Sequence, residues 1–420
     1  MIPEKEKLTI VKVLYARPHI GGSGRVGIET ALELARRGHD VHIVSYPDTY
    51  LEDEEKDLLT LHALDDISYG CFKVNPIGVT FPSKIHQLAN ELKIDVLHAH
   101  YAITHGEAVI DARDSIRRDI RRGKLPHYSR DPVAVITCHG SDITVNGYKN
   151  IIAPNLELKL SQADEITFVS QSLQDEARRI LDLDDYGKVI YNFVDENKFR
   201  RDESGKTRLK VRNEWGIPPD ALVYYHVSNF RPVKNTAMLI DAMHSLTSDG
   251  CNDHVRLLLI GDGPDRMCVE EKVIQYGLQD KVIFTGQVSP EKVPSYSQAG
   301  DVLLLPSIKE SFGLVNLEAM HLGNACIASR VGGIPEVLFH NVSGYMFDPA
   351  STEELVHHMR KFAKDPLRSR FMGAQGRKIA NKRFNRSSIA DMYECTYHDT
   401  LARANDHSVY RELPLQRQFG

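Results

Sequence analysis

The sequence has few cysteines, none of them closely spaced, and no long hydrophobic run. Without C-x-x-C spacing, neither a disulfide framework nor a zinc site is expected, and all six are interpreted as reduced thiols: Cys71, Cys138, Cys251, Cys268, Cys326 and Cys395. No window approaches the roughly 20 apolar residues of a membrane span. Residues 1–7 lack the basic start and apolar stretch of a signal peptide. These absences predict a cytoplasmic protein.

A strong excess of positive charge is also lacking. The formal net charge is −5 in 420 residues, which argues against a nucleic-acid-binding protein held by bulk electrostatics. The hydrophobic share of 42% and the charged share of 26% are typical of a globular protein. A chain of this length exceeds one ordinary core, so two domains of roughly 200 residues each are expected.

Both halves of the sequence alternate short apolar runs with amphipathic stretches, the pattern of an α/β fold with parallel sheets. Strands are predicted at 8–16, 41–45, 96–98, 134–138, 165–169, 188–191, 222–227, 255–260, 282–285, 302–305 and 326–329. Two doubly wound, Rossmann-like domains would then face each other across a cleft at the carboxyl ends of their strands. The predicted parts are an N-terminal domain 1–195, a linker 196–210, a C-terminal domain 211–385, and a helix and tail 386–420 that returns to the N-terminal domain.

The stretch 306–318 carries the main functional pattern. It lies between the strand 302–305 and a predicted helix at 315–321, so the turn at Glu310–Gly313 presents free backbone N–H groups and the positive end of a helix dipole, where a phosphate fits. Glu310 and Glu318 stand eight residues apart and can face one side of a bound molecule. Because a carboxylate accepts hydrogen bonds from paired hydroxyls, the stretch indicates a nucleotide sugar as ligand. A solvated helix face is the alternative.

Two cations follow the first strand of the second half. Arg231 and Lys234 are three residues apart at a strand-to-helix turn, where both can converge on one anion. A solvated basic turn is the alternative interpretation.

A glycine-rich loop is predicted after the first strand, and from Gly22 to Gly27 it fits the dinucleotide pattern G-x-G-x-x-G. An acidic residue at the tip of the second strand would support NAD, but Ser45-Tyr46-Pro47 stands there. Glycines that let the backbone approach a diphosphate explain the stretch equally well. An NAD oxidoreductase therefore stays open as an alternative.

Histidines also follow predicted strands. His139 stands at a strand's carboxyl end, where it could donate to a substrate hydroxyl or serve a structural role. His98 and His100 point the same way on a strand, but no third ligand lies nearby in sequence, so no metal site is predicted.

The segment 108–130 forms a basic amphipathic helix that also carries aspartates. It fits either contact with anionic lipid or a plain surface helix.

Taken together, these motifs resemble the family-four retaining glycosyltransferases, which have the GT-B fold of two Rossmann-like domains. The matching pieces run from Gly21 to about Asp348 and include Gly332-Gly333-Ile334-Pro335-Glu336. Within the family, the likeness is greatest to the bacillithiol-pathway enzymes that join N-acetylglucosamine from UDP-N-acetylglucosamine to L-malate. That likeness rests on Ala99-His100-Tyr101, His139–Val145, Tyr191–Asp195 and His226–Arg231.

The resemblance implies roles for individual residues. Catalytic roles fall to four residues: His139, which touches the transferring sugar, Arg231 and Lys234, which hold the diphosphate, and Glu310, which holds the donor sugar. Donor-binding roles fall to Gly22, Asn229, Ser311, Phe312, Gly313, Leu314 and Glu318, with Glu318 on the ribose hydroxyls. Acceptor-binding roles fall to Ser23, Tyr101, Thr137 and Asn192, and Gly22 also faces the acceptor. No metal and no cofactor beyond the UDP-sugar co-substrate are implied.

The predicted function is therefore metal-independent transfer, with retention and by a front-face mechanism, of a sugar from a UDP-sugar to a small hydroxy acid such as L-malate. Three alternatives stay open beside the NAD enzyme: a family-four transferase with a lipid or carbohydrate acceptor, a UDP-N-acetylglucosamine epimerase, and a non-catalytic sugar-nucleotide sensor, which would leave His139 unexplained. No nucleic-acid partner is expected, and membrane contact and a homodimer stay open. One departure from the family pattern is His321-Leu322-Gly323-Asn324-Ala325, which stands where a Cys-Gly-x-Pro-like run is common.

Overall fold

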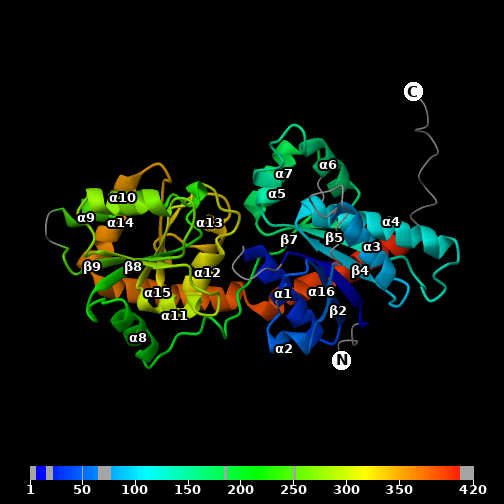
Figure 1. Cartoon of the computed structure of the whole chain (residues 1–420), viewed down its shortest axis with the longest axis horizontal. Helices are drawn as coiled ribbons and strands as arrows, with labels where there is room; N and C mark the ends of the chain where they lie inside the picture. Colours follow the sequence, from blue (N-terminus) through cyan, green and yellow to red (C-terminus); the bar gives the residue numbers. More distant parts are fainter. Residues whose placement is uncertain are drawn as a thin grey trace. The chain divides into compact units, whose positions relative to one another are not determined.

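The structure is a computed structural model that describes residues 6–15, 22–49, 51–64, 77–183, 187–248 and 252–406. The chain divides into two compact units, which Figure 1 colours along the sequence. Unit 1 holds the chain as far as Val169, residues 174–190, and the chain from Ser387 onward. Unit 2 holds residues 170–173 and 191–386.

Unit 1 is built on a seven-stranded parallel sheet in the order β3-β2-β1-β4-β5-β6-β7. Its strands are β1 (Thr9–Val13), β2 (Asp40–Ser45), β3 (Thr60–Ala63), β4 (Val96–His100), β5 (Val133–Cys138), β6 (Glu165–Phe168) and β7 (Lys188–Val189). The strand order reverses between β1 and β4, which is the switch point where such sheets bind ligands.

The helices associated with this sheet are α1 (Gly22–Arg36), α2 (Asp53–Lys56), α3 (Ile77–Leu88), η1 (Ala102–Gly106), α4 (Glu107–Arg121), α5 (Ser141–Thr144), α6 (Ala153–Ser161), α7 (Gln171–Ile180) and α16 (Arg386–Asn405). Helix α16 belongs to unit 1 from Ser387 onward. Its Tyr397 is fully buried, and the hydroxyl lies 2.7 Å from Nδ1 of His98 on β4. Its Glu394 lies 3.1 Å from Nε2 of the buried His39.

Unit 2 repeats the architecture with six parallel strands in the order β10-β9-β8-β11-β12-β13. Its strands are β8 (Leu222–Val227), β9 (Val255–Ile260), β10 (Val282–Gly286), β11 (Val302–Leu305), β12 (Ala325–Ser329) and β13 (Gly344–Phe347). The helices are α8 (Lys206–Glu214), η2 (Pro232–Lys234), α9 (Thr236–Thr247), α10 (Arg266–Gln275), α11 (Val293–Ala299), α12 (Leu314–His321), α13 (Ile334–Val337), α14 (Thr352–Lys364) and α15 (Pro366–Arg383).

The core of unit 2 explains why its strands could be predicted. Leu257 and Leu259 of β9, Leu304 of β11 and Ile327 of β12 are completely buried in one cluster with helices α9 and α14. Strands covered on both faces are apolar throughout, which makes them visible in sequence. The strands predicted at 222–227, 255–260 and 302–305 accordingly coincide with β8, β9 and β11.

Three predicted features differ in the structure. The glycine-rich stretch was predicted as a loop, but α1 begins at Gly22, so Gly22 to Gly27 are helical. A Cβ at Gly27 would lie 2.9 Å from Cδ2 of Leu14, so this glycine allows α1 to pack closely on the chain after β1. The segment 196–210, predicted as a linker, lies within unit 2, where α8 begins at Lys206. Strands β3 and β13 were not predicted.

Candidate active site

In unit 2, the predicted site residues gather at the carboxyl edge of the sheet, at its switch point. The strand order reverses between the neighbouring strands β8 and β11. The loop that carries Asn229, Arg231 and Lys234 follows β8, and the loop that carries Glu310 follows β11. The topology alone therefore brings the two predicted motifs together at the position where open α/β sheets bind ligands.

An ion pair joins the two loops. Nζ of Lys234 lies 2.6 Å from Oε2 of Glu310, and both side chains are partly exposed. Backbone contact supports it, because the N–H of Ile308 donates to the carbonyl of Val233 over 2.8 Å. The hydroxyl of Ser307 donates to the same carboxylate oxygen over 3.4 Å. The edge thus holds one cation and one carboxylate in contact.

Arg231 and Asn229 are exposed on the same loop. Arg231 has no ion-pair partner within the described part of the chain. The loop is anchored between them by Phe230, which is completely buried and has a φ of +32°. The carbonyl of Phe230 also accepts from the N–H of Asp265 over 2.9 Å. A buried anchor with exposed polar neighbours leaves Arg231 and Asn229 accessible to a ligand.

Two glycines fix the loops by direct backbone contact. A Cβ at Gly332, after β12, would lie 1.8 Å from the carbonyl oxygen of Glu310. A Cβ at Gly263, after β9, would lie 1.9 Å from the carbonyl oxygen of Asn229. The N–H of Gly333 donates to the Glu310 carbonyl over 3.1 Å. Any side chain at Gly332 or Gly263 would displace the loop beside it.

Helix α12 begins at this edge. Gly313 is its N-cap with a φ of +87°, and Leu314 is its first residue. Phe312 is buried against Tyr191 and Phe384, with ring centroids 6.0 and 5.8 Å away. The first N–H groups of a helix have no partner within the helix and carry partial positive charge. Buried Phe312 therefore fixes a helix start that can bind an anion.

Glu318 lies one turn further along α12 and is partly exposed. Burial raises the pKa of its carboxyl to about 7. A carboxyl with this pKa is present in both protonation states near neutral pH. The affinity for any ligand that it binds therefore depends on pH.

His226, on β8, stabilises the start of the first loop. Its Nδ1 donates to the carbonyl of Leu304 over 2.8 Å, so its Nε2 accepts from the hydroxyl of Ser228, 2.7 Å away. The Ser228 oxygen in turn accepts from the N–H of Phe230 over 3.2 Å. Burial lowers the pKa of His226 to about 4, so it is neutral at physiological pH. His226 was predicted only as part of the motif His226–Arg231, and this positioning role was not expected.

In unit 1, Asp142 connects the loops after β4 and β5. Its carboxylate accepts from the N–H groups of His139, Gly140, Ala102 and Ile143 at 2.7 to 3.2 Å. The side chain is completely buried, and burial raises its pKa. Asp142 was predicted only as part of the motif His139–Val145, although aspartates in turns typically accept hydrogen bonds from nearby backbone N–H groups.

His139 and Tyr101 lie on these two loops. Nε2 of His139 lies 2.9 Å from Nδ1 of His100, and its ring lies 5.6 Å from that of Tyr101. The Tyr101 hydroxyl lies 3.1 Å from Oγ of Ser141, and its backbone has a φ of +91°. Burial, together with nearby Lys12, lowers the pKa of His139 to about 3. His139 is therefore a neutral hydrogen-bonding group and not a cation at neutral pH.

The remaining predicted residues differ in exposure. Gly22 is exposed and Ser23 partly exposed at the start of α1. Thr137 is completely buried, with its hydroxyl 2.7 Å from His98 and 2.6 Å from Thr167, so it lies inside the sheet and away from any surface. Asn192, in unit 2, is also buried, and its side-chain oxygen has no partner within the described ranges.

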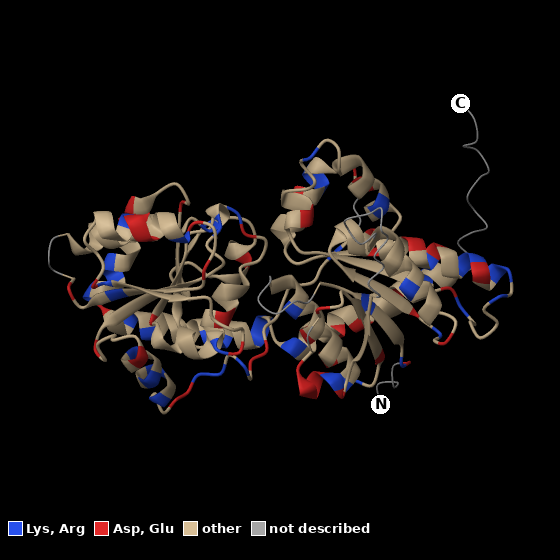
Figure 2. Ribbon diagram, viewed as in Figure 1, with Lys and Arg blue, Asp and Glu red and all other residues tan. Residues whose placement is uncertain are grey.

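The described residues were compared with the requirements of a metal site and of a membrane contact. Within the described ranges, no three histidine, cysteine, aspartate or glutamate residues are placed to hold a metal ion. No described helix is long and apolar enough to cross a membrane. Helix α4 carries basic and acidic residues side by side (Figure 2). Its Arg113 and Arg117 bind Asp164 at 2.9 and 3.0 Å, so these two arginines already have an acidic partner.

Two family models match the chain. The model of glycosyl transferases group 1 matches residues 207–379, and that of Glycosyltransferase Family 4 matches residues 20–198. The chain is 33% identical over 385 residues to N-acetyl-alpha-D-glucosaminyl L-malate synthase of Bacillus anthracis, covering 91% of this chain and 95% of the relative. It is 27% identical over 345 residues to D-inositol 3-phosphate glycosyltransferase of Streptomyces griseus, covering 74% of this chain and 69% of the relative.

The fold has a solved counterpart. The crystal structure of Anabaena Alr3699/HepE in complex with UDP and glucose superimposes with a TM-score of 0.76 at 20% identity, covering 93% of this chain and 99% of that chain. The prediction of two Rossmann-like domains is confirmed by the two parallel sheets and by this likeness. With both family models matched and one relative covered almost completely, this chain belongs to the family-four glycosyltransferases of the GT-B fold and is a hexosyltransferase.

Proposed function

We propose that this protein is a retaining glycosyltransferase that moves N-acetylglucosamine from UDP-N-acetylglucosamine to the hydroxyl group of a small hydroxy acid such as L-malate. The name of the relative from Bacillus anthracis supports N-acetylglucosamine as the transferred sugar and L-malate as the acceptor. The observation that carries the proposal is the carboxyl edge of unit 2, where Lys234, Glu310 and the start of α12 meet at the switch point.

The chemistry of the donor explains why this edge suits it. Departure of UDP from the anomeric carbon builds negative charge on the β-phosphate and positive charge on the sugar ring. Arg231, Lys234 and the N–H groups at the start of α12 supply fixed positive charge for the phosphate. A charge-assisted hydrogen bond contributes about 1.5–3 kcal/mol, which corresponds to about one to two decades in rate.

When the donor binds, Lys234 and Glu310 can exchange their contact with each other for contacts with the ligand. A diphosphate attracts Lys234, which frees the Glu310 carboxylate to accept from sugar hydroxyls. Glu318, further along α12, takes the ribose hydroxyls in its ionised form. In unit 1, neutral His139 can donate one hydrogen bond to the transferring sugar without adding charge.

The acceptor residues in the proposal come from the start of α1 and the loop after β4. Ser23 and Tyr101 are at least partly exposed and can contact a small polar acceptor. Thr137 is enclosed by His98 and Thr167, so we assign it a supporting role through the sheet. In the front-face mechanism, the departing phosphate accepts the proton of the acceptor hydroxyl as the new glycosidic bond forms and the old one breaks.

The test is UDP release from UDP-N-acetylglucosamine, measured without acceptor, with L-malate, and with a panel of other hydroxy acids and sugars. Malate-dependent release with an α-linked product supports the proposal. Release that requires a different acceptor would support a transferase but exclude malate as its acceptor. Free N-acetylmannosamine formed without any acceptor identifies an epimerase instead, and co-sedimentation with anionic vesicles favours a lipid acceptor.

A further inference from the structure

A polar cavity lies at the amino ends of the unit 2 strands, opposite the candidate donor site. Its volume is about 310 Å³, and it is lined by three arginines: Arg201, Arg208 and Arg370. Asp301 precedes β11 and Gly323 precedes β12, so the cavity lies at the amino ends of these strands. In a parallel sheet, this edge is opposite the one that holds Lys234 and Glu310. The cavity is therefore separate from the candidate donor site.

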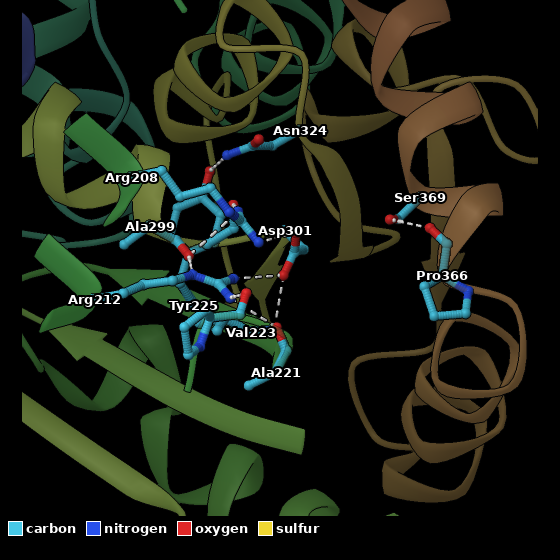
Figure 3. Close-up of polar contacts among 12 residues, drawn as sticks. Arg208, Arg212, Ala221, Val223, Tyr225, Ala299, Asp301, Asn324, Pro366 and Ser369 are labelled. Carbon is cyan, nitrogen blue, oxygen red and sulfur yellow. Dashed lines mark hydrogen bonds and ion pairs between the residues drawn. The ribbon is translucent and has the colours of Figure 1, made fainter. Parts of the chain in front are cut away.

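The single carboxylate in the cavity wall is already neutralised. Oδ1 of Asp301 accepts from Arg208 over 2.8 Å, and Oδ2 accepts from Arg212 over 2.9 Å and from the N–H of Val223 over 2.8 Å. Figure 3 shows Arg208 and Arg212 converging on Asp301, with Ser369 of α15 facing them. Arg212 is completely buried behind the wall. Both carboxylate oxygens of Asp301 therefore already accept hydrogen bonds from within unit 2.

Among the residues that the structure describes, the other two arginines lack an anionic partner. There, Arg201 donates to the carbonyls of Leu322 and Gly323, both over 3.4 Å, which is long for a hydrogen bond. Arg370 is exposed on α15 and has no ion-pair partner within the described ranges. Gly323, which has a φ of +74°, lies beside Arg201, and a Cβ there would be in ordinary contact with Nη1 of Arg201 at 3.5 Å. The cavity therefore holds uncompensated positive charge.

We propose that this cavity binds a phosphate group, either as free phosphate or as part of a small phosphomonoester. A tetrahedral dianion offers several acceptor oxygens, which match the planar donors of Arg201 and Arg370 in bidentate contacts. A ligand here would connect α15 to the segment before α8 and to the turn between α12 and β12. The cavity is thus a second ligand site of unit 2, at the edge of the sheet remote from sugar transfer.

The experiment is titration calorimetry of the whole protein, without nucleotide, using inorganic phosphate and glycerol 3-phosphate as separate probes. The variants are Arg201→Gln and Arg370→Gln. The matched control is Arg360→Gln, an exposed arginine on α14 that donates only to the carbonyl of Ser245. Lys234→Ala serves as a second control, because it alters the candidate donor site alone. Thermal unfolding of each variant verifies that it is folded.

We expect saturable binding of one equivalent of at least one probe to the unaltered protein and to both controls. Arg201→Gln and Arg370→Gln should each weaken it by about tenfold or more, the loss of one charge-assisted contact. Tighter binding of glycerol 3-phosphate identifies an organic phosphomonoester, and equal or weaker binding identifies free phosphate. The proposal is overturned if neither probe binds at millimolar concentration, or if either control weakens binding as much as the cavity variants do.

Discussion

Lys234 and Glu310 stand 76 residues apart in sequence and meet in an ion pair of 2.6 Å at the carboxyl edge of the second sheet. Neighbouring strands β8 and β11 bring them together. Each residue has a proposed ligand of its own, the diphosphate for Lys234 and the sugar for Glu310. The pair therefore holds both groups in position before a donor arrives.

Lys234→Ala should keep the fold and lose activity. The pair is partly exposed, so its removal should change the free energy of unfolding by no more than about 1 kcal/mol. Loss of a charge-assisted contact to the diphosphate should lower kcat/KM by about one to two decades or more. The measurements are UDP release with acceptor present, and urea unfolding.

Lys364→Ala is the matched control, since Lys364 is an exposed lysine at the end of α14. It should leave both measurements unchanged. Normal turnover in Lys234→Ala would remove the diphosphate role of this residue.

Glu318 should make UDP binding dependent on pH. Its pKa of about 7 means that the ionised form, which we propose accepts from the ribose hydroxyls, grows between pH 6 and pH 8. Affinity for UDP should therefore rise several-fold over this range and, near pH 7, binding should release protons. Calorimetry in buffers of different ionisation enthalpy measures both effects.

Glu318→Gln should weaken UDP binding and abolish its pH dependence, whereas Glu353→Gln, an exposed control on α14, should keep both. In the unliganded protein, the free energy of unfolding should change in the opposite direction to the UDP affinity and fall as the pH rises. Because the folded-state pKa lies above the unfolded value, this group's contribution to stability is complete at acid pH and is lost as the pH rises through about 7. UDP affinity that stays flat with pH in the unaltered protein would contradict the ribose assignment.

Gly332→Ala should damage the site through the backbone. The added Cβ would lie 1.8 Å from the carbonyl oxygen of Glu310, so the loop that carries this glutamate must move. Gly277→Ala is a control for backbone strain, since Gly277 also has a positive φ, +65°, but a Cβ there would meet nothing within 4 Å.

Both variants should lose about 1–2 kcal/mol of stability from the left-handed backbone. Only Gly332→Ala should also lose transfer activity, by tenfold or more, since small displacements of a positioned group are costly. Equal activity of the two variants would show that the position of Glu310 does not matter for transfer.

Much of unit 2 could be predicted because its strands are apolar throughout and its motifs follow strand ends. Neighbouring strand ends meet at one edge, so Arg231, Lys234 and Glu310 could be grouped from sequence alone. The start of α1 could not, because glycines at a helix start resemble a loop until the packing against Leu14 is seen. Strand β3 was missed because it lies at the edge of its sheet, and its partly or fully exposed residues Thr60-Leu61-His62-Ala63 form no buried apolar run.

The supporting residues of the site were also beyond sequence reasoning. Asp142 and His226 act through backbone groups and through neighbours on other strands, and neither contact leaves a spacing in the sequence. Thr137 was predicted to contact the acceptor because its motif lies near the end of a strand. Its side chain is instead completely buried against the neighbouring strand. Exposure of an individual side chain depends on the packing around it, which the sequence pattern does not encode.

Lys12 is a buried lysine in the middle of β1, and its replacement should stabilise the protein. The side chain is completely buried, and its Nζ has no hydrogen-bond partner within the described part of the chain. It lies 5.8 Å from the centre of the Tyr393 ring. Burial lowers the pKa of Lys12 well below its usual value, so the folded protein binds its proton much more weakly than the unfolded chain does.

Lys12 should also make the stability of the protein depend on pH. Below the ordinary lysine pKa of about 10.4, the unfolded state binds a proton that the folded state does not favour, so this residue costs stability at neutral pH and the cost falls as the pH rises. Lys12→Met should raise the free energy of unfolding at pH 7 by about 1–3 kcal/mol, the cost of one unsatisfied buried donor. Urea unfolding at pH 6 to 10 should also show a flatter pH dependence in the variant.

Lys7→Met, at an exposed position just before β1, is the control and should stay within about 0.5 kcal/mol of the unaltered protein. A destabilised Lys12→Met would contradict the prediction and would mean that the amine has a favourable partner. A variant that is more stable but transfers sugar more slowly would instead place Lys12 among the groups that tune His139, whose pKa it lowers.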